Sequence, residues 1–281
     1  MHGSSNPYLI ESIRVMRNQE TTAYKLTRDY LRRDANESLR SNRIVVTPSD
    51  RQAMLSWAYD TVDVCNINRY VAITAMTYLD RFLANSRCRR ANLALSSRQE
   101  FQLCFITCFI IAMKTRAGMN VGSHFISKHL CHGLYSANEI LQVELEVLRG
   151  LRWKLNGPTA IDFVHAFLEL TPQWKNVRVM DSLVKVAEGQ VELAMMDYSL
   201  ALQEASSIAY SAVLLAVNYM GCCDVDQSPW IQSLSIITGN EAHDSRSRLI
   251  CHRMIGIASI DHACRVFAPD AQRSKQATPF S

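Results

Sequence analysis

Apolar residues recur every three or four positions along most of this 281-residue chain, and that spacing restricts its fold more than any other feature. Such a period places apolar side chains on one face of an α-helix, whereas a half-buried strand alternates every second residue. We find no convincing alternating segment in the sequence. The pattern therefore predicts an all-α fold.

Helix-start signals divide this pattern into elements. Ser49, Ser97 and Ser136 are each followed three positions later by a Gln or a Glu. This is the spacing of a capping box, in which the hydroxyl accepts a backbone N–H and the later side chain reaches back. Thr159, followed by Asp162, is a fourth start of the same kind. The predicted helices cover residues 9–33, 49–65, 69–85, 97–115, 122–132, 136–153, 159–170, 177–198, 205–221, 228–237 and 244–266.

The turn-forming segment Asn156-Gly157-Pro158 separates two helical sets. The third helix of each set, containing Leu103–Met113 or Ile208–Met220, is apolar on all sides, as a helix enclosed by others would be. We therefore expect two consecutive five-helix domains preceded by an N-terminal helix. The expected limits are 1–44 for the extension and its helix, 45–157 and 158–267 for the two domains, and 268–281 for a flexible tail.

The composition argues against two classes of partner. The formal net charge of +4 is too small for nucleic-acid binding without a clustered basic face. The longest apolar run, Leu103 to Met113, is too short to span a bilayer. We also expect no secretory signal, because the first residues lack a basic segment followed by an apolar one.

Cysteine and histidine usage predicts neither disulfides nor a metal. The nine cysteines are scattered and include no CxxC pair, which favours a reducing compartment. The cluster most suggestive of zinc matches no closed four-ligand site, and it consists of His124, His129, Cys131 and His132. There is also no phosphate-binding glycine loop and no nucleophile elbow, so no cofactor is expected.

A charged residue within an apolar stripe is the first candidate for a functional role. Arg51 lies in the apolar stripe of its helix, and Asp80 borders the stripe of the next helix. An ion pair between them would fix the two helices in one relative orientation. The alternative is an Arg51 side chain that reaches solvent from the first helical turn.

Glu144 and Lys114 form a second candidate pair. Glu144 projects between Ile140, Val147 and Leu151, and an unpaired carboxylate there would be costly. Lys114 ends the apolar helix before it. The two residues would form either a private salt bridge or an exposed clamp whose ammonium and carboxylate bind a partner's backbone. Geometry alone favours the salt bridge.

Five motifs in this order resemble a cyclin box. They are Arg51–Trp57, Tyr78–Leu83, Ala112–Lys114, the segment from Glu144 to Trp153 with Leu148 and Leu151, and Pro158-Thr159 with Phe163. The resemblance is strong over about residues 45–165. Residues 166–266 resemble the C-terminal cyclin fold only in pattern, mainly through Ser206–Ala209. The fold implied is two consecutive five-helix cyclin-fold domains.

This resemblance implies a non-catalytic subunit that binds and activates a cyclin-dependent serine/threonine kinase in cell-cycle control, in nucleus and cytoplasm. Lys114 and Glu144 would then clamp kinase backbone beside the movable C-helix, which shifts the preference from salt bridge towards clamp. Phe109 and Ile110 would be apolar anchors, although each is equally suited to the core. Arg51 and Asp80 would form an internal brace.

The resemblance also implies a groove for Arg-x-Leu peptides of substrates or inhibitors. Trp57 would form its centre and Asp60 would bind the peptide's Arg. Ala53 is smaller than the family's usual residue there, so the groove would be shallow or unused, and Trp57 is equally consistent with half-buried core. The predicted groove comprises Ala53, Met54, Trp57, Asp60, Phe101 and Gln102.

Other interpretations remain open at this stage. One is a cyclin of a transcription or nutrient-signalling kinase, and less favoured ones are a nucleic-acid-binding cyclin-fold transcription factor and a helical enzyme. Residues 115–120 replace the acidic, Pro-rich turn usual after the family's Lys, which leaves the kinase unidentified. Arg28, Leu31 and Asn36 match a destruction-box pattern, but their place in a predicted helix favours coincidence.

Overall fold

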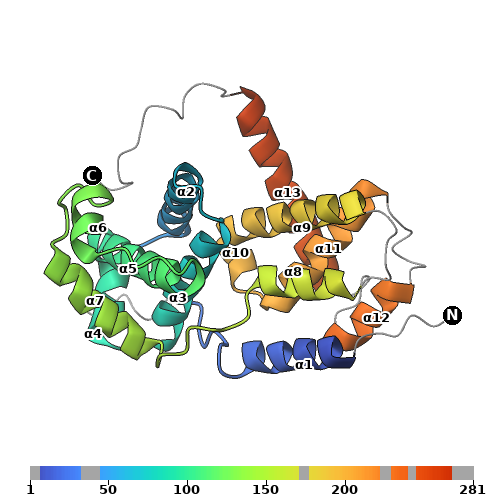
Figure 1. Ribbon diagram of the computed structural model, residues 1–281, viewed down its shortest axis with the longest axis horizontal. Helices are drawn as coiled ribbons and strands as arrows, with labels where there is room; N and C mark the ends of the chain where they lie inside the picture. The colour runs from blue at the N-terminus through green and yellow to red at the C-terminus, as the bar shows by residue number, and fades with distance from the viewer. Residues whose placement is uncertain (1–6, 33–44, 171–176, 222–228, 240–244, 268–281) are drawn as a thin grey trace. The chain divides into compact units, whose positions relative to one another are not determined.

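The computed structural model describes residues 7–32, 45–170, 177–221, 229–239 and 245–267 (Figure 1). This part of the chain contains helices and no strand, which confirms the predicted all-α class. The first seven helices are α1 (Pro7–Thr21), α2 (Pro48–Val64), α3 (Tyr70–Asn85), α4 (Arg89–Ser96), α5 (Arg98–Arg116), α6 (Ser123–His129) and α7 (Ala137–Gly150). The remaining helices are α8 (Ala160–Glu169), α9 (Val177–Met196), α10 (Tyr198–Ala201), α11 (Ala205–Met220), α12 (Pro229–Thr238) and α13 (Ser245–Phe267).

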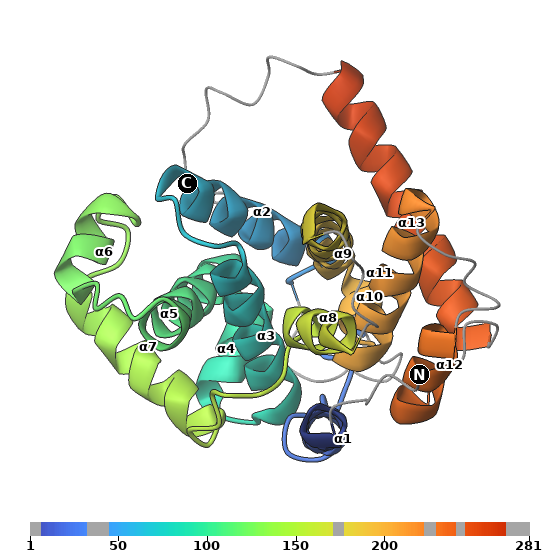
Figure 2. The same cartoon turned by 45° about the vertical axis from the view of Figure 1, so that its right-hand side comes forward.

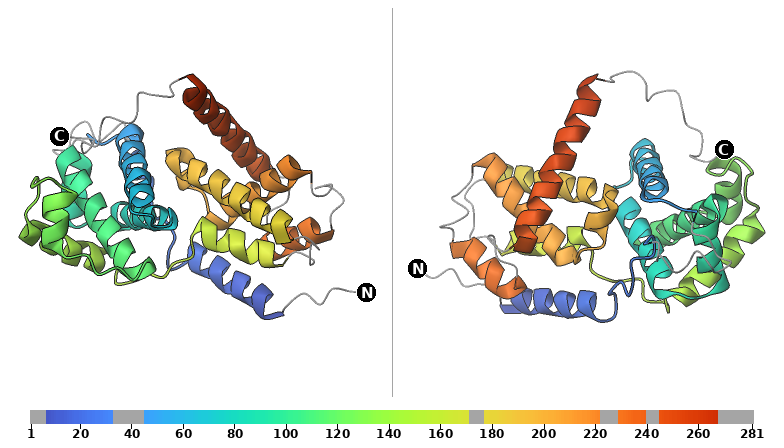
Figure 3. Two further views of the ribbon diagram at one scale, coloured as in Figure 1. Left: turned by 45° about the horizontal axis from the view of Figure 1, so that its top comes forward. Right: turned by 180° about the vertical axis from the view of Figure 1, so that it is seen from behind.

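Contacts divide the chain into two compact units. One unit holds residues 26–156 and is called the α5 unit here, and the other holds residues 1–25 with 157–273 and is called the α11 unit. The helix of the N-terminal extension therefore groups with the second set of helices, a partition that the sequence pattern did not indicate. Figure 3 shows α1 beside α12, and α1 also contacts α8.

The α5 unit is built around its namesake helix. Helix α5 packs against α2, α3, α4 and α7 (Figure 2), and every residue from Phe101 to Met113 is buried. Burying a Phe side chain contributes roughly 1.5–3 kcal/mol, so Phe101, Phe105 and Phe109 stabilise this core strongly. Helix α11 has the corresponding place in the other unit, where it packs against α8, α9 and α13. The expectation of one enclosed helix in each set agrees with this packing.

The capping signals position these helices with one exception. Ser136 with Glu139 and Thr159 with Asp162 form capping boxes, and the Ser97 side chain accepts the backbone N–H of Glu100. The box predicted at Ser49 is wrong, because Thr47 is the N-cap of α2 and pairs with Asp50. Pro48 then occupies the first turn of the helix, where its missing N–H is no loss.

The first helix is shorter than predicted, and two helices were not predicted at all. The chain leaves α1 at Thr21 instead of continuing to residue 33, because hydroxyls of Thr21 and Thr22 bond to carbonyls of the last turn and the following residues bond to α3. Helix α4 was missed because it is short, and its Arg90 binds Glu146 of α7 at 3.0 Å and Glu100 of α5. Helix α10 is a single turn.

Candidate functional site

Arg51 and Asp80 lie in contact inside the α5 unit. The Arg51 side chain is fully buried, and its Nε and Nη2 donate to Asp80 Oδ1 and Oδ2 at 2.9 and 2.8 Å. The Tyr30 hydroxyl donates to the same Oδ1 at 2.6 Å. Burial alone would lower the pKa of Arg51, but Asp80 and Tyr30 raise it above its ordinary value. The guanidinium is therefore charged, and the pair joins α2 to α3 without solvent.

Lys114 and Glu144 also lie in contact, but nearer the surface. Lys114 Nζ donates to Glu144 Oε1 at 2.6 Å, across the junction of α5 and α7. The Lys side chain is 34% exposed and the Glu side chain 14% exposed. The salt bridge of the first alternative is thus present, and its exposure leaves the ammonium accessible to a second protein. Its role as a clamp stays a prediction.

Phe109 and Ile110 do not have the placement predicted for anchors. Phe109 is completely buried and Ile110 is 2% exposed, because α5 is enclosed by four helices. The Phe109 ring packs edge-on against Trp57, with ring centroids 5.7 Å apart. Both residues belong to the core, and in this structure neither offers surface to a partner.

The exposed apolar side chains near the Lys114–Glu144 pair come instead from α7 and the residues after it. Leu141 is 49% exposed, Leu145 is 40% exposed and Leu148 is half-buried. These three lie on one flank of α7 beside Glu144, whereas Ile140, Val143 and Val147 face the core. The sequence indicates this exposed apolar flank, since α7 carries three leucines in addition to the three apolar residues of its buried stripe.

Trp153 adds a large aromatic side chain beyond the end of α7. It is 62% exposed, and both it and Arg152 have left-handed backbone, with φ of 58° and 54°. Non-glycine residues rarely adopt that conformation, which holds the indole outside the regular helix. Sequence reasoning placed Trp153 within a helix to residue 153 and did not assign it to the site.

Three of the six predicted groove residues have accessible surface. Trp57 and Ala53 are half-buried and Asp60 is exposed. Partial burial and then the neighbouring Asp63 raise the pKa of Asp60 above its ordinary value. The other three residues are completely buried, which corrects their assignment to an open groove, and they are Met54, Phe101 and Gln102.

Gln102 has an incomplete set of hydrogen bonds. Its Oε1 accepts the Tyr135 hydroxyl at 2.9 Å, while its buried Nε2 has no partner among the residues that the structure describes. Gln102 precedes Phe105 and Phe109 by one and two helical turns, and both rings pack against Trp57. Gln102 therefore lies on the same face of α5 as these two rings, nearer the N-terminus of the helix.

Arg28 and Leu31 of the destruction-box pattern lie in a non-helical segment after α1, not in the helix that was predicted there. Arg28 Nη2 donates to the Leu83 carbonyl at 3.0 Å, and Leu31 is 9% exposed. Asn36 lies outside the described residues, so the motif stays untested. Within the described chain, no three His, Cys, Asp or Glu side chains converge as a metal site requires. No described helix is long and apolar enough to cross a bilayer.

Comparison with known proteins assigns this architecture to a family. The family model described as "Cyclin, N-terminal domain" matches residues 11–156. Cyclin-A1-2 of Arabidopsis thaliana is 26% identical over 211 residues, which cover 75% of this chain and 45% of that protein. G1/S-specific cyclin-D1 of Homo sapiens is 28% identical over 178 residues, covering 62% of this chain and 55% of that protein. The chain thus spans about half the length of the curated relatives it matches.

A solved structure shares the fold over most of the chain. The viral cyclin of herpesvirus saimiri superposes with a TM-score of 0.62 at 15% identity, covering 89% of this chain and 96% of the viral protein. The family model alone covers more than half of the 281 residues. The chain therefore belongs to the cyclin family.

Proposed function

We propose that this chain is the non-catalytic regulatory subunit of a cyclin-dependent serine/threonine kinase that acts in cell division, in nucleus and cytoplasm. The observation that carries the proposal is the partly exposed Lys114–Glu144 pair in a member of the cyclin family. The pair is partly open to solvent, so a second protein can reach its ammonium and carboxylate.

The surroundings of the pair support a protein partner. The flank of α7 next to Glu144 presents Leu141, Leu145 and Leu148, and Trp153 lies beyond its end. Binding hot spots are enriched in Trp, and the exposed leucines provide apolar surface beside the two charged groups. The ammonium of Lys114 would donate to a kinase carbonyl, and the carboxylate of Glu144 would accept a kinase N–H.

The mechanism is a shift of population in the kinase. A protein kinase aligns ATP only when its strand Lys pairs with the Glu of its C-helix. A subunit that binds the inward C-helix more tightly than the outward one raises the inward population by its differential affinity. The cyclin contributes no reacting group to this step. It contributes a surface that fits one of two kinase conformations.

The test is binding to a panel of purified cyclin-dependent kinases. Lys114→Ala and Glu144→Ala are expected to weaken binding of the kinase partner at least tenfold and to lower its activation equally. Arg253→Ala is the matched control, because Arg253 pairs with Asp197, which has the same 14% exposure as Glu144, in the α11 unit. Wild-type chain that binds and activates no kinase of the panel would contradict the proposal.

A second candidate function is peptide docking at Trp57. The observation that favours it is the half-buried Trp57 with the exposed Asp60 three residues further along α2. A peptide Arg would pair with Asp60, and an apolar peptide side chain would pack against Trp57. An Arg-x-Leu peptide is expected to bind wild-type chain and to lose affinity with Asp60→Asn. Equal affinity for both proteins would exclude this use of the groove.

Cell division is one of two roles open to a kinase-binding cyclin, and the other is control of a transcription or nutrient-signalling kinase. The amount of the protein distinguishes the two roles, since a change through the division cycle favours the first. A constant amount with binding to a transcription kinase favours the second.

A further inference from the structure

Residues 17–30 lie before the helices of the α5 unit and contact one helix terminus in each unit. We propose that this segment is a strap with two capping ends: Arg17 and Glu20 complete the N-terminus of α11, and Thr27 and Arg28 complete the C-terminus of α3. The inference concerns the fold of the free chain and is independent of any kinase partner.

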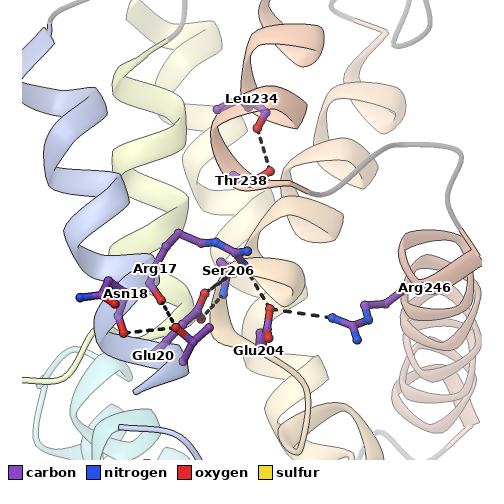
Figure 4. Close-up of polar contacts among 9 residues, drawn as sticks. Arg17, Asn18, Glu20, Glu204, Ser206, Leu234, Thr238 and Arg246 are labelled. Atoms are coloured by element: carbon purple, nitrogen blue, oxygen red, sulfur yellow. Dashed lines mark hydrogen bonds and ion pairs between the residues drawn. The ribbon is translucent and has the colours of Figure 1, made fainter. Parts of the chain in front are cut away.

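The first end replaces a cap that α11 lacks. Its N-cap residue, Glu204, makes no side-chain cap hydrogen bond. Glu204 instead binds Arg17 at 3.1 Å and Arg246 at 3.8 Å (Figure 4). The first backbone N–H groups of a helix need outside acceptors, so α11 must find one elsewhere.

Glu20 of α1 provides that acceptor. Its Oε2 accepts the backbone N–H of Ser206 at 3.0 Å, and its Oε1 accepts the Ser206 hydroxyl at 2.5 Å. Arg17 Nη1 donates to Glu20 Oε1 at 3.2 Å and to Ser206 Oγ at 2.7 Å (Figure 4). A carboxylate at a helix N-terminus is also favoured by the helix dipole.

Burial makes this cap specific. Glu20 is 7% exposed and Ser206 is fully buried, so water cannot replace the carboxylate without opening the unit. The charges in the cluster are balanced, since Arg17 and Arg246 oppose Glu20 and Glu204. Helix α11 is the central helix of its unit, where it packs against α8, α9 and α13.

The second end satisfies carbonyl groups at the end of α3. Thr27 Oγ1 donates to the Ala84 carbonyl at 2.7 Å, and Arg28 Nη2 donates to the Leu83 carbonyl at 3.0 Å. Both carbonyls belong to the last turn of a helix, where intrahelical partners run out. The backbone N–H of Thr27 also donates to Asn85 Oδ1 at 2.8 Å. The Tyr30 hydroxyl also donates to Asp80 of α3.

Tyr24, between the two ends of the strap, lies close to Gly157, which precedes α8. At Gly157 a Cβ atom would lie 2.3 Å from Cδ1 of Tyr24, far inside contact distance. The φ of Gly157 is not positive, so alanine is unfavourable there because of Tyr24 and not because of backbone strain. Gly157→Ala therefore disturbs the middle of the strap while leaving all of its polar anchors intact.

The experiment is backbone hydrogen exchange measured on the full chain. Glu20→Ala is expected to speed exchange in the first turn of α11 about tenfold, in line with loss of a helix cap. Thr27→Val with Arg28→Ala is expected to do the same for the last turn of α3. Glu20→Gln keeps an acceptor oxygen and an intact shape, so it is expected to give a smaller increase than Glu20→Ala and remains measurable if the alanine variant does not fold.

Arg253→Ala is the control for loss of a surface ion pair, and it should leave exchange at both helix ends unchanged. Gly157→Ala is expected to speed exchange in residues 21–26. An increase confined to the helix end that matches each variant supports the strap. Unchanged exchange at both ends, or an equal increase throughout a unit, would overturn it, because Glu20, Thr27 and Arg28 would then not act as caps.

Discussion

Two ion pairs in the α5 unit each join two neighbouring helices, but they differ in their exposure to solvent. Arg51 and Asp80 are buried, with side-chain exposures of 0% and 5%, whereas Lys114 is 34% exposed and Glu144 14% exposed. The first pair is a two-bond fork with a third donor in Tyr30, and the second pair is a single short contact. The buried pair thus stabilises the fold, whereas the partly exposed pair is accessible for binding a partner.

This difference follows from the cost of desolvation. Two buried charges are tolerated only when each is satisfied, and loss of one leaves the other unpaired in a medium of low dielectric constant. A partly exposed pair regains water when one partner is lost, so its own contribution to stability is small. Such a pair can exchange its internal contact for a partner's backbone at little cost.

Arg51→Ala should have the largest effect on stability. It leaves the Asp80 carboxylate buried with Tyr30 and without its cation, which is expected to cost about 3–5 kcal/mol of unfolding free energy. Chemical denaturation measures this directly. A loss below about 1 kcal/mol would show that Asp80 finds another partner and that the buried pair is no brace.

Tyr30→Phe should have an intermediate effect. The substitution keeps the ring and removes one hydrogen bond to a charged group, so about 1.5–3 kcal/mol of stability should be lost. The same denaturation measurement applies. In combination with Arg51→Ala the two losses should not add, because both residues bind Oδ1 of Asp80. Additive losses would mean that the two contacts are independent.

Lys114→Ala should change the stability of the free chain by no more than about 1 kcal/mol, because the pair is partly exposed. Thermal unfolding of this variant and of Arg253→Ala should therefore be nearly the same. A loss as large as that of Arg51→Ala would assign Lys114 to the fold and remove the contrast between the two pairs.

The smallest effect is expected at His165 in the α11 unit. A hydrogen bond to Glu188 at 2.9 Å outweighs burial and raises the pKa of His165 above its ordinary value of 6.5. The pair therefore stabilises the fold fully below about pH 6.5 and loses this contribution as the pH rises through the raised pKa. His165 is 54% exposed, so the change should stay below about 1 kcal/mol. His165→Asn should abolish this pH dependence, and a pH dependence that persists would assign it to another group.

Local chemistry explains which parts of this molecule could be predicted from sequence. Apolar period and capping residues are short-range signals, so most of the helices and the enclosed α5 and α11 could be predicted, but the short α4 and α10 could not. The Arg51–Asp80 contact could be proposed because a charge within an apolar stripe needs a partner. Side-chain exposure depends on how neighbouring helices pack, so the sequence left Phe109 and Ile110 open between anchor and core and did not assign Trp153 to the site. The contact of Glu20 with Ser206 joins residues far apart in the chain, and no periodic signal marks it.

A charge swap at the exposed pair tests most directly whether Lys114 and Glu144 bind a kinase. Lys114→Glu combined with Glu144→Lys restores an ion pair but reverses the donor and acceptor offered to a kinase backbone. We expect thermal stability close to that of the wild type, with kinase binding weakened at least as much as by either alanine variant. Wild-type kinase affinity in the swapped protein would show that the two charges serve only each other.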